Sequence, residues 1–156
     1  MQIRSHSAAN TLNLGKIIAR HLQPKDIICL KGELGTGKTV LTKGIAHGLG
    51  VDKSKVTSSS FVLIRQHLEG RVPLYHFDLY RLKDAACIST LGYEEYFYDE
   101  GVSVIEWAER LDYLMPAEYL MVELCYGANT NRVIKFSAVG KRYISLLKKI
   151  YENIRH

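Results

Sequence analysis

The residues with the clearest chemical meaning are 32 to 39, which form a complete G-x-x-x-x-G-K-T pattern. Glycines without a Cβ let consecutive backbone N–H groups point at a phosphate. Lys38 can bring a positive charge to the outer phosphates, and the Thr39 hydroxyl can take one position around Mg²⁺. The pattern therefore predicts a cradle for the phosphates of a nucleotide. Its members are Gly32, Glu33, Leu34, Gly35, Thr36, Gly37, Lys38 and Thr39.

Two acidic residues elsewhere in the chain could complete this chemistry. Hydrolysis of a nucleotide needs carboxylate oxygens near the γ-phosphate, both for Mg²⁺ and for the attacking water. Asp78 follows the apolar run 74–77, and Glu106 follows the apolar run 102–105. Each acid thus ends a predicted strand, where an α/β sheet presents its ligand groups. Either could instead be an ordinary strand-end acid that caps a helix, but beside the phosphate cradle one or both are expected near Mg²⁺.

The segments on either side of the cradle predict a strand, a loop and a helix in that order. Residues 27–30 are an apolar run of the kind found in buried parallel strands. A helix that starts at the loop adds its dipole to the charge of Lys38. Gly44 and Gly48 predict that this helix packs closely on a sheet. The residues at helical spacing are Val40, Leu41, Gly44, Ile45, Gly48 and Leu49.

The rest of the chain continues this alternation of elements. The predicted strands are 3–6, 61–68, 72–77, 102–105, 119–125 and 132–139, with hairpins at 69–70 and 127–129. The predicted helices are 8–22, capped by Ser7, short helices within 84–98, and 108–114, ended by Pro116. This order predicts an α/β protein with the three-layer P-loop NTPase fold. Its mixed sheet has a parallel centre and antiparallel edge strands, in one domain over 1–156.

Composition narrows the class of protein. The chain has 156 residues, 47% of them apolar, and no apolar stretch long enough to span a membrane. No apolar signal segment follows Met1, and the three cysteines are odd in number and widely spaced. We therefore expect a soluble protein of a reducing cytoplasm with no membrane contact. Since no histidine pairs with a cysteine at zinc-ligand spacing, a structural metal is not expected.

Most of the net charge of +5 lies in the last sixteen residues, 141–156, where five basic residues face the single acid Glu152. A helical wheel places the basic residues opposite an apolar side. Two interpretations stay open: a docked terminal helix with a solvated basic face, or a contact with nucleic acid or another anionic partner. The predicted apolar side consists of Ile144, Leu146, Leu147, Ile150, Tyr151 and Ile154.

Four strings in the sequence together resemble one protein family. They are GELGTGKT, HFDLYRL from residue 76, LGYEEY from residue 91 and IEWAERL from residue 105. This combination is similar to the TsaE (YjeE) family, bacterial ATPases required for threonylcarbamoyladenosine modification of tRNA. The resemblance runs from about Thr11 to Pro116, and the strings behind the loop are more specific than the loop itself.

The resemblance implies ATP and Mg²⁺ as cofactors. The implied catalytic residues are Lys38, Asp78 and Glu106, and the implied metal ligands are Thr39, Asp78 and Glu106. The implied nucleotide contacts are the eight loop residues with Thr11, Val40, Ser60 and Trp107. Trp107 could equally be a core tryptophan. Residues 56–61 resemble the family's first switch segment, usually T-S-P-T-F, but here Ser59 replaces proline and Ser60 replaces threonine. Ser60 still offers a hydroxyl for ligation or for positioning water.

The resemblance also implies partners: a TsaB–TsaD pair, in which TsaD transfers the threonylcarbamoyl group to tRNA. The protein itself would be a nucleotide-gated switch on that pair, and its contact with tRNA would be indirect. Arg65, Arg81 and Arg110 could stabilise charge in the transition state. Since nothing marks one of them as an arginine finger, slow turnover without partners is expected. Tyrosines near Asp78 could form a partner surface or pack in the core.

Two other functions stay open. A small-molecule kinase would use the same cradle, but the sequence has no arginine-rich lid. A nucleotide sensor would bind ATP without turnover. A GTPase is disfavoured, because no N-K-x-D string that reads guanine occurs. Chain order alone suggests that the 8–22 helix flanks the nucleotide base.

Overall fold

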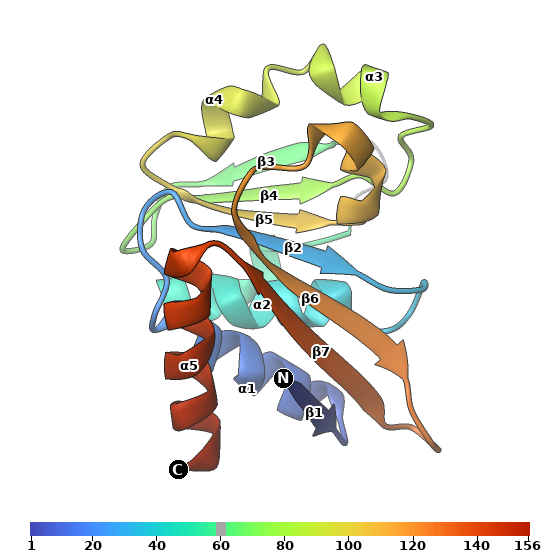
Figure 1. The fold of residues 1–156 in the computed structure, drawn as a ribbon, viewed down its shortest axis with the longest axis vertical. Helices are drawn as coiled ribbons and strands as arrows, with labels where there is room; N and C mark the ends of the chain where they lie inside the picture. Colours follow the sequence, from blue (N-terminus) through green and yellow to red (C-terminus); the bar gives the residue numbers. More distant parts are fainter. Residues whose placement is uncertain (59–61) are drawn as a thin grey trace.

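The computed structural model describes residues 1–58 and 62–156, and its centre is a seven-stranded sheet (Figure 1). The strand order is β1-β7-β6-β2-β5-β4-β3. The strands are β1 (Gln2–Ser5), β2 (Ile27–Lys31), β3 (Ile64–His67), β4 (Leu74–Asp78), β5 (Val102–Glu106), β6 (Tyr119–Tyr126) and β7 (Arg132–Val139). The helices are α1 (Ala8–Ala19), α2 (Lys38–Leu49), α3 (Ala85–Ser89), α4 (Tyr93–Phe97) and α5 (Lys141–Arg155), with 3-10 turns η1 (Lys53–Lys55) and η2 (Ala108–Leu114).

The sheet has the predicted mixture of directions. β6, β2, β5 and β4 run parallel to their neighbours in the centre. At one edge β3 pairs antiparallel with β4, and at the other β7 pairs antiparallel with β6 and β1 with β7. The α/β class, the parallel centre and the antiparallel edges are therefore confirmed, as are both predicted hairpins. The carboxyl ends of the parallel strands lie together at one end of the sheet, and Asp78 and Glu106 are the last residues of two of these strands.

Helices cover both faces of the sheet and make three layers (Figure 1). Successive strand residues point to opposite faces, and β2 shows this directly. Ile28 and Leu30 belong to the core under α1, α2 and α5, whereas Ile27 and Cys29 belong to the core under α3, α4 and η2. Since both faces of this central strand are covered, its apolar residues run without interruption, as the sequence indicated.

The glycines of α2 pack differently from the prediction. A Cβ at Gly44 would lie 2.1 Å from the Leu12 carbonyl oxygen, and one at Gly48 would lie 2.5 Å from the Ala19 Cβ. Both neighbours belong to α1, so the glycines allow close contact between two helices and not between helix and sheet. Gly15 of α1 faces the same contact, because its Cβ would meet the backbone of α2. The prediction was wrong about the partner, since helical spacing defines a face but not what covers it.

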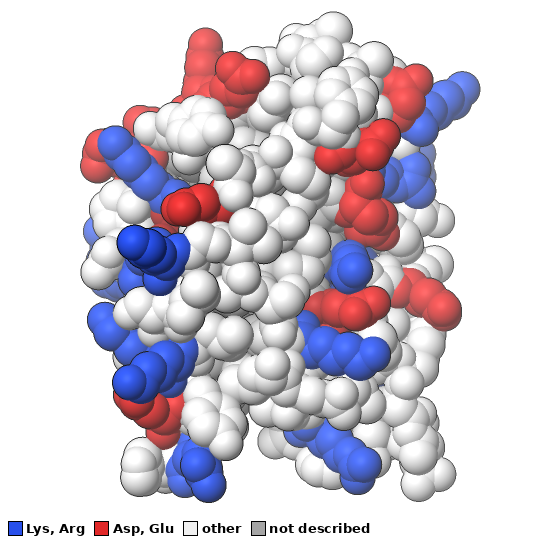
Figure 2. Space-filling model, viewed as in Figure 1, with Lys and Arg blue, Asp and Glu red and all other residues white. Residues whose placement is uncertain are grey.

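The basic terminal helix is docked on the molecule. Tyr143, Leu146 and Ile150 of α5 are buried in the core under α1 and α2. Ile144, which the helical wheel placed on the apolar side, is 61% exposed. Figure 2 shows blue basic side chains along the edge where α5 lies, so its outer face is cationic.

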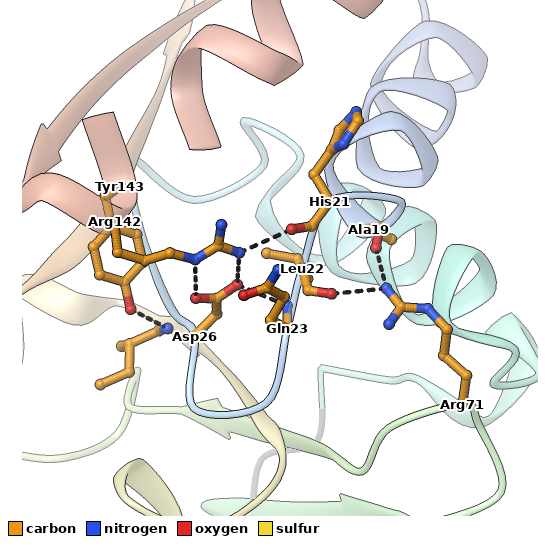
Figure 3. Close-up of polar contacts among 9 residues, drawn as sticks. Ala19, His21, Leu22, Gln23, Asp26, Arg71, Arg142 and Tyr143 are labelled. Carbon is orange, nitrogen blue, oxygen red and sulfur yellow. Dashed lines mark hydrogen bonds and ion pairs between the residues drawn. The ribbon is translucent and has the colours of Figure 1, made fainter. Parts of the chain in front are cut away.

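Polar contacts fix the start of α5 to the end of α1 (Figure 3). Arg142 donates through Nε to Asp26 Oδ1 at 2.9 Å and through a second nitrogen to the His21 carbonyl at 2.9 Å. Arg71 donates in the same way to the Ala19 and Leu22 carbonyls, at 2.6 and 2.9 Å. Both arginines thus donate to carbonyl groups at and just beyond the end of α1, where helical hydrogen bonds run out.

Two further observations concern the helices. The predicted helix at 108–114 is a 3-10 segment with a kink at Asp112, whose φ is 49°.

Among the described residues, no helix combines the length and the apolar character needed to cross a membrane.

Candidate functional site

The glycine-rich loop, residues 32–39, joins the end of β2 to the start of α2, as predicted. Gly32, Gly35 and Gly37 all have positive φ, at 146°, 80° and 104°. Gly32 also lacks room for a side chain, because a Cβ there would lie 2.3 Å from the Leu124 carbonyl oxygen. These backbone angles strain any residue with a Cβ. The loop therefore curls at the N-terminus of α2, where unpaired N–H groups favour an anion.

Lys38 points into the space beside this loop. Its Nζ donates to the carbonyls of Gly32 at 2.5 Å and Glu33 at 2.8 Å, and lies 4.0 Å from the centre of the Trp107 ring. Burial lowers the pKa of the ammonium group, and the negative charges of Glu106, Glu109 and Asp78 oppose that effect. Among the described residues, carbonyls and a ring face hold this buried cation, which suits a site that receives a strong anion.

Glu106 ends β5 and is 1% exposed. Its Oε2 accepts a hydrogen bond from the Thr39 hydroxyl at 3.0 Å, and its Oε1 from the Thr42 hydroxyl at 2.9 Å. His76 Nε2 lies 3.0 Å from the same Oε1. Burial raises the pKa of Glu106, but the hydrogen bond and charge of His76, with the two threonine hydroxyls, outweigh it and lower the pKa overall. The carboxylate is therefore ionised, and each of its two oxygens has a hydrogen-bond partner among the neighbouring side chains.

Asp78 ends β4, directly opposite Glu106 in the register of the parallel strands. Its Oδ1 accepts a hydrogen bond from the Tyr80 backbone N–H at 3.1 Å. Burial raises the pKa of Asp78 and the charge of Glu106 raises it further, while the Tyr80 N–H lowers it. The two acids thus lie side by side with pKa values shifted in opposite directions, since side chains donate to Glu106 while the Tyr80 backbone N–H donates to Asp78.

These groups surround a cavity of about 490 Å³. The residues that line it are Leu34, Gly35, Gly37, Lys38, Thr39, Val40, Ser58, Leu63, Asp78, Tyr80, Arg81, Glu106 and Trp107. The structure thus brings together nine of the residues predicted for the site. The lining does not include Gly32, Glu33, Thr36 or Thr11. Ser60, the remaining predicted residue, lies outside the described residues.

Two predicted residues that do not line the cavity, Thr36 and Thr11, contact the loop or lie close to it. The Thr36 hydroxyl donates to the Glu33 carbonyl at 2.8 Å. Thr11 is 3% exposed, and its hydroxyl lies 2.7 Å from that of Ser5. Its methyl group would be 3.8 Å from a Cβ at Gly37. Contact of Thr11 with a nucleotide stays a prediction.

Trp107 both packs against the core and lines the cavity, so the two interpretations of this residue are compatible. Its ring lies 5.0 Å from that of Tyr80, with the Arg110 guanidinium 5.7 Å from its centre. Its φ is 59°, in the left-handed region that is strained for a tryptophan. This backbone turn at the end of β5 directs the indole toward Lys38.

Sequence reasoning missed two residues that contact Glu106, His76 and Thr42. A usable signal was present for both. His76 precedes Asp78 by two residues on one strand, so both side chains face the same way. Thr42 follows Thr39 by three residues on one helix and shares its face. Ser58 and Leu63, on either side of the undescribed segment, also line the cavity without having been predicted.

The donor set fits Mg²⁺ but is small. Carboxylate and hydroxyl oxygens are the ligands that Mg²⁺ prefers. Within residues 1–58 and 62–156, no three or more His, Cys, Asp and Glu side chains converge where a metal ion could bind. A cation beside Thr39, Asp78 and Glu106 therefore needs further oxygens from phosphate and water. Sharing its ligands with a bound phosphate is how Mg²⁺ usually binds to proteins.

The fold and the site define an α/β protein with a glycine-rich loop between its central strand β2 and helix α2, beside a cavity lined by two strand-end acids. The family model described as "Threonylcarbamoyl adenosine biosynthesis protein TsaE" matches residues 5–134. The chain belongs to the TsaE family.

Individual relatives agree with the family match. A protein from Bacillus subtilis named tRNA threonylcarbamoyladenosine biosynthesis protein TsaE is 37% identical over 97% of this chain and 95% of its own length. A protein of the same name from Nostoc is 41% identical over 79% of this chain and 76% of its own length. The crystal structure of Bacillus subtilis YdiB matches with a TM-score of 0.85 and 35% identity, over 98% of this chain and 95% of that one.

Proposed function

We propose that this protein binds ATP with Mg²⁺, hydrolyses it slowly, and thereby supports threonylcarbamoyladenosine modification of tRNA. The observation that carries the proposal is the hydrogen bond from the Thr39 hydroxyl to the Glu106 carboxylate, beside Lys38 at the end of the glycine-rich loop. A hydroxyl on the loop, a strand-end carboxylate and a buried lysine are the three groups that nucleotide hydrolysis requires around the β- and γ-phosphates. Membership of the TsaE family supports the pathway.

Each residue has a distinct role in this proposal. Lys38 leaves the carbonyls of Gly32 and Glu33 and pairs with the outer phosphates. Thr39 and Glu106 hold the metal side of the site, where bound Mg²⁺ neutralises phosphate charge. Asp78, at the end of the neighbouring strand β4, orients the attacking water. Its raised pKa suits a group that receives a proton as the water attacks.

The nucleotide base is assigned to a second cavity, of about 380 Å³. Val40 lines both cavities, so a nucleotide with its phosphates at the loop could extend past Val40. Ala8, Ala9 and Leu12 of α1 form one apolar wall, while Lys43, Lys53 and Ser54 provide polar groups. With this assignment the first helix would flank the base, as chain order suggested.

The exposed residues at the opening of the cavity support the proposed switch on partner proteins. Leu34 and Tyr80 line the cavity and are 65% and 44% exposed. A partner that covers them would contact the phosphate end of the site, so the loss of a γ-phosphate would change its binding surface. We propose that this partner is the TsaB–TsaD pair, with TsaB and TsaD acting on tRNA and this protein resetting them.

Phosphate release measured with and without the TsaB–TsaD pair tests the proposal. We expect slow release by the protein alone, because nothing in the sequence marks an arginine as a transition-state finger, and faster release with the pair. Retention of the pair on immobilised protein should depend on ATP rather than ADP. Equal rates of release, with retention that ignores the nucleotide, would contradict the switch.

The same assay separates the other two functions. A small-molecule kinase would transfer label from γ-labelled ATP to a metabolite rather than to water. A sensor would bind ATP with no turnover in either condition. Turnover that is lost in Asp78→Asn while ATP still binds would exclude the sensor.

A further inference from the structure

Two polar side chains, His76 and Thr42, contact Glu106 on the side away from the cavity and have no direct role in the proposed chemistry. His76 is 2% exposed and Thr42 is fully buried. Both contact Oε1 of Glu106, at 3.0 and 2.9 Å, and neither lines the cavity. Buried polar side chains are costly unless each has a partner. Their shared target is therefore a specific arrangement of this site.

The hydrogen-bond roles in this cluster follow from chemistry. An ionised carboxylate only accepts hydrogen bonds, so His76 Nε2 carries the proton that faces Oε1. The Thr42 hydroxyl has one hydrogen and lies 2.9 Å from two acceptors, Oε1 of Glu106 and the Lys38 carbonyl. The charged acceptor is the stronger of the two. Two donors thus occupy Oε1.

The two oxygens of Glu106 are consequently unequal. Oε1 faces the interior and holds two donors, whereas Oε2 faces the Thr39 hydroxyl at the cavity. A carboxylate fixed in this way cannot rotate to offer both oxygens to a metal. It presents one oxygen, in one direction, beside the loop hydroxyl.

We propose that His76 and Thr42 are positioning residues that hold Glu106 in a one-oxygen orientation and so set the affinity of the site for Mg²⁺. The inference rests on the proposed function, since it concerns the metal that accompanies the nucleotide. Partners of this kind, one bond behind the metal ligands, typically contribute about 10- to 100-fold in metal affinity. Nucleotide binding without the metal depends on the loop and Lys38 and is independent of the cluster.

The test uses full-length variants in matched pairs. Thr42→Val keeps the shape and removes the hydroxyl, while Thr42→Ser restores a hydroxyl. His76→Leu removes the donor, while His76→Gln places a side-chain N–H near the position of Nε2. Trp107 is the only tryptophan in the chain and lines the site, so its fluorescence reports on binding there. Mg²⁺ is titrated into protein saturated with ADP, and calorimetry measures ADP binding in EDTA.

We expect Thr42→Val and His76→Leu to raise the Mg²⁺ concentration at half-saturation by about 10- to 100-fold. ADP affinity in EDTA should stay within about twofold of the unmodified protein, and Thr42→Ser and His76→Gln should recover most of the Mg²⁺ affinity. A merely structural role would weaken ADP binding in EDTA as well and would not separate Val from Ser. If His76→Leu fails to fold, the Thr42 pair decides alone.

Three results would overturn the inference. Unchanged Mg²⁺ dependence in Thr42→Val, with the unmodified protein binding Mg²⁺ and ADP, overturns it while leaving the proposed function intact. The same holds if ADP binding in EDTA falls in parallel. If the unmodified protein binds neither ADP nor ATP, the proposed function fails and takes this inference with it.

Discussion

A single carboxylate, that of Glu106, connects three elements of the molecule. It belongs to β5 and receives hydrogen bonds from Thr39 and Thr42 of α2 and from His76 of β4. A buried carboxylate is tolerated only when donors replace the water that it has lost. Here the donors also fix its direction.

A second buried carboxylate gives a stability prediction at the same scale. Asp26 is 3% exposed and receives hydrogen bonds from Arg142 and from the Gln23 N–H. Arg142→Ala leaves this charge without its ion-pair partner. We expect the free energy of unfolding at pH 7 to fall by about 3 kcal/mol, the low end for a buried pair, because part of Arg142 remains exposed. Urea denaturation measures it.

The adjacent exposed residue provides the control. Lys141→Ala should change the free energy of unfolding by less than about 0.5 kcal/mol. If Arg142→Ala is equally neutral, Arg142 belongs to the solvated basic face of α5 and the ion pair contributes nothing.

Sequence reasoning at this scale succeeded where residue type and local spacing were enough. Lys38, Thr39, Asp78 and Glu106 could be identified because a motif or a strand end marks each of them. His76 and Thr42 carried a local signal, because they share a face with Asp78 and Thr39, but no motif pairs either of them with Glu106, 30 and 64 residues away. The partner of Arg142 could not be identified, since that contact joins residues 116 positions apart. In the sequence Arg142 is only one more basic residue of the tail.

At the scale of elements, α1 and α2 lie against each other through glycines. Gly15, Gly44 and Gly48 leave no space for a methyl group between the two backbones. The start of α2 holds Lys38 and Thr39, so the contact that fixes α2 also fixes the cradle. The packing of these two helices is therefore part of the site.

Gly44→Ala tests this packing. Alanine favours a helix by about 1 kcal/mol over glycine, but here its Cβ would meet the Leu12 carbonyl at 2.1 Å, a backbone atom that cannot rotate away. We expect the backbone clash to dominate, with a net loss of about 2 kcal/mol in the free energy of unfolding and a lower Tm. Thermal unfolding followed by circular dichroism is the measurement.

Ser145→Ala is the matched change on an exposed helix face. It should leave Tm unchanged or slightly raised, as helix propensity alone predicts. A Gly44→Ala protein that is as stable as this control would show that α1 and α2 can move apart at no cost.

Elements were predictable to within a few residues wherever apolar periodicity was strong. Both hairpins, the buried central strands and the short helices near residues 84 to 98 were identified in this way. The partner of the α2 glycines and the 3-10 form of η2 were not. Both depend on how elements meet, and the kink at Asp112 follows no local pattern that the sequence displays.

At the scale of the whole molecule, the two ends of the parallel sheet have different roles. The carboxyl ends carry the cavity, Asp78 and Glu106. The opposite end carries the contact between Asp26, the end of α1 and the start of α5 (Figure 3). The ion pair between Arg142 and Asp26 thus stabilises the amino end of the sheet, away from the cavity at the carboxyl end.

Two histidines, the buried His67 and the partly exposed His21, are expected to make stability depend on pH. Burial lowers the pKa of His67 and of His21 below 6.5, and for His21 the charges of Lys149, Arg20 and Arg142 add to the effect. The unfolded chain then binds protons more readily than the folded one. Their contribution is therefore present above about pH 6.5 and is lost as the pH falls toward the lowered pKa values.

We expect the free energy of unfolding to be lower at pH 5.5 than at pH 7.5. His67→Gln removes one titrating group and should reduce that difference, whereas His156→Gln, at the exposed C-terminus, should leave it unchanged. Urea denaturation of the three proteins at both pH values is the measurement. An equal difference in all three would exclude His67 as a source of the pH dependence.

We propose that the glycine-rich loop and Lys38 hold the phosphates of ATP, and calorimetry of ATP with Mg²⁺ measures that contact. The unmodified protein and Lys148→Ala, which removes an exposed lysine of α5, should bind with equal heat and affinity. Lys38→Ala should bind about 10- to 100-fold more weakly, the loss expected for one charged hydrogen-bonding group. Undiminished heat and affinity in Lys38→Ala would contradict the account.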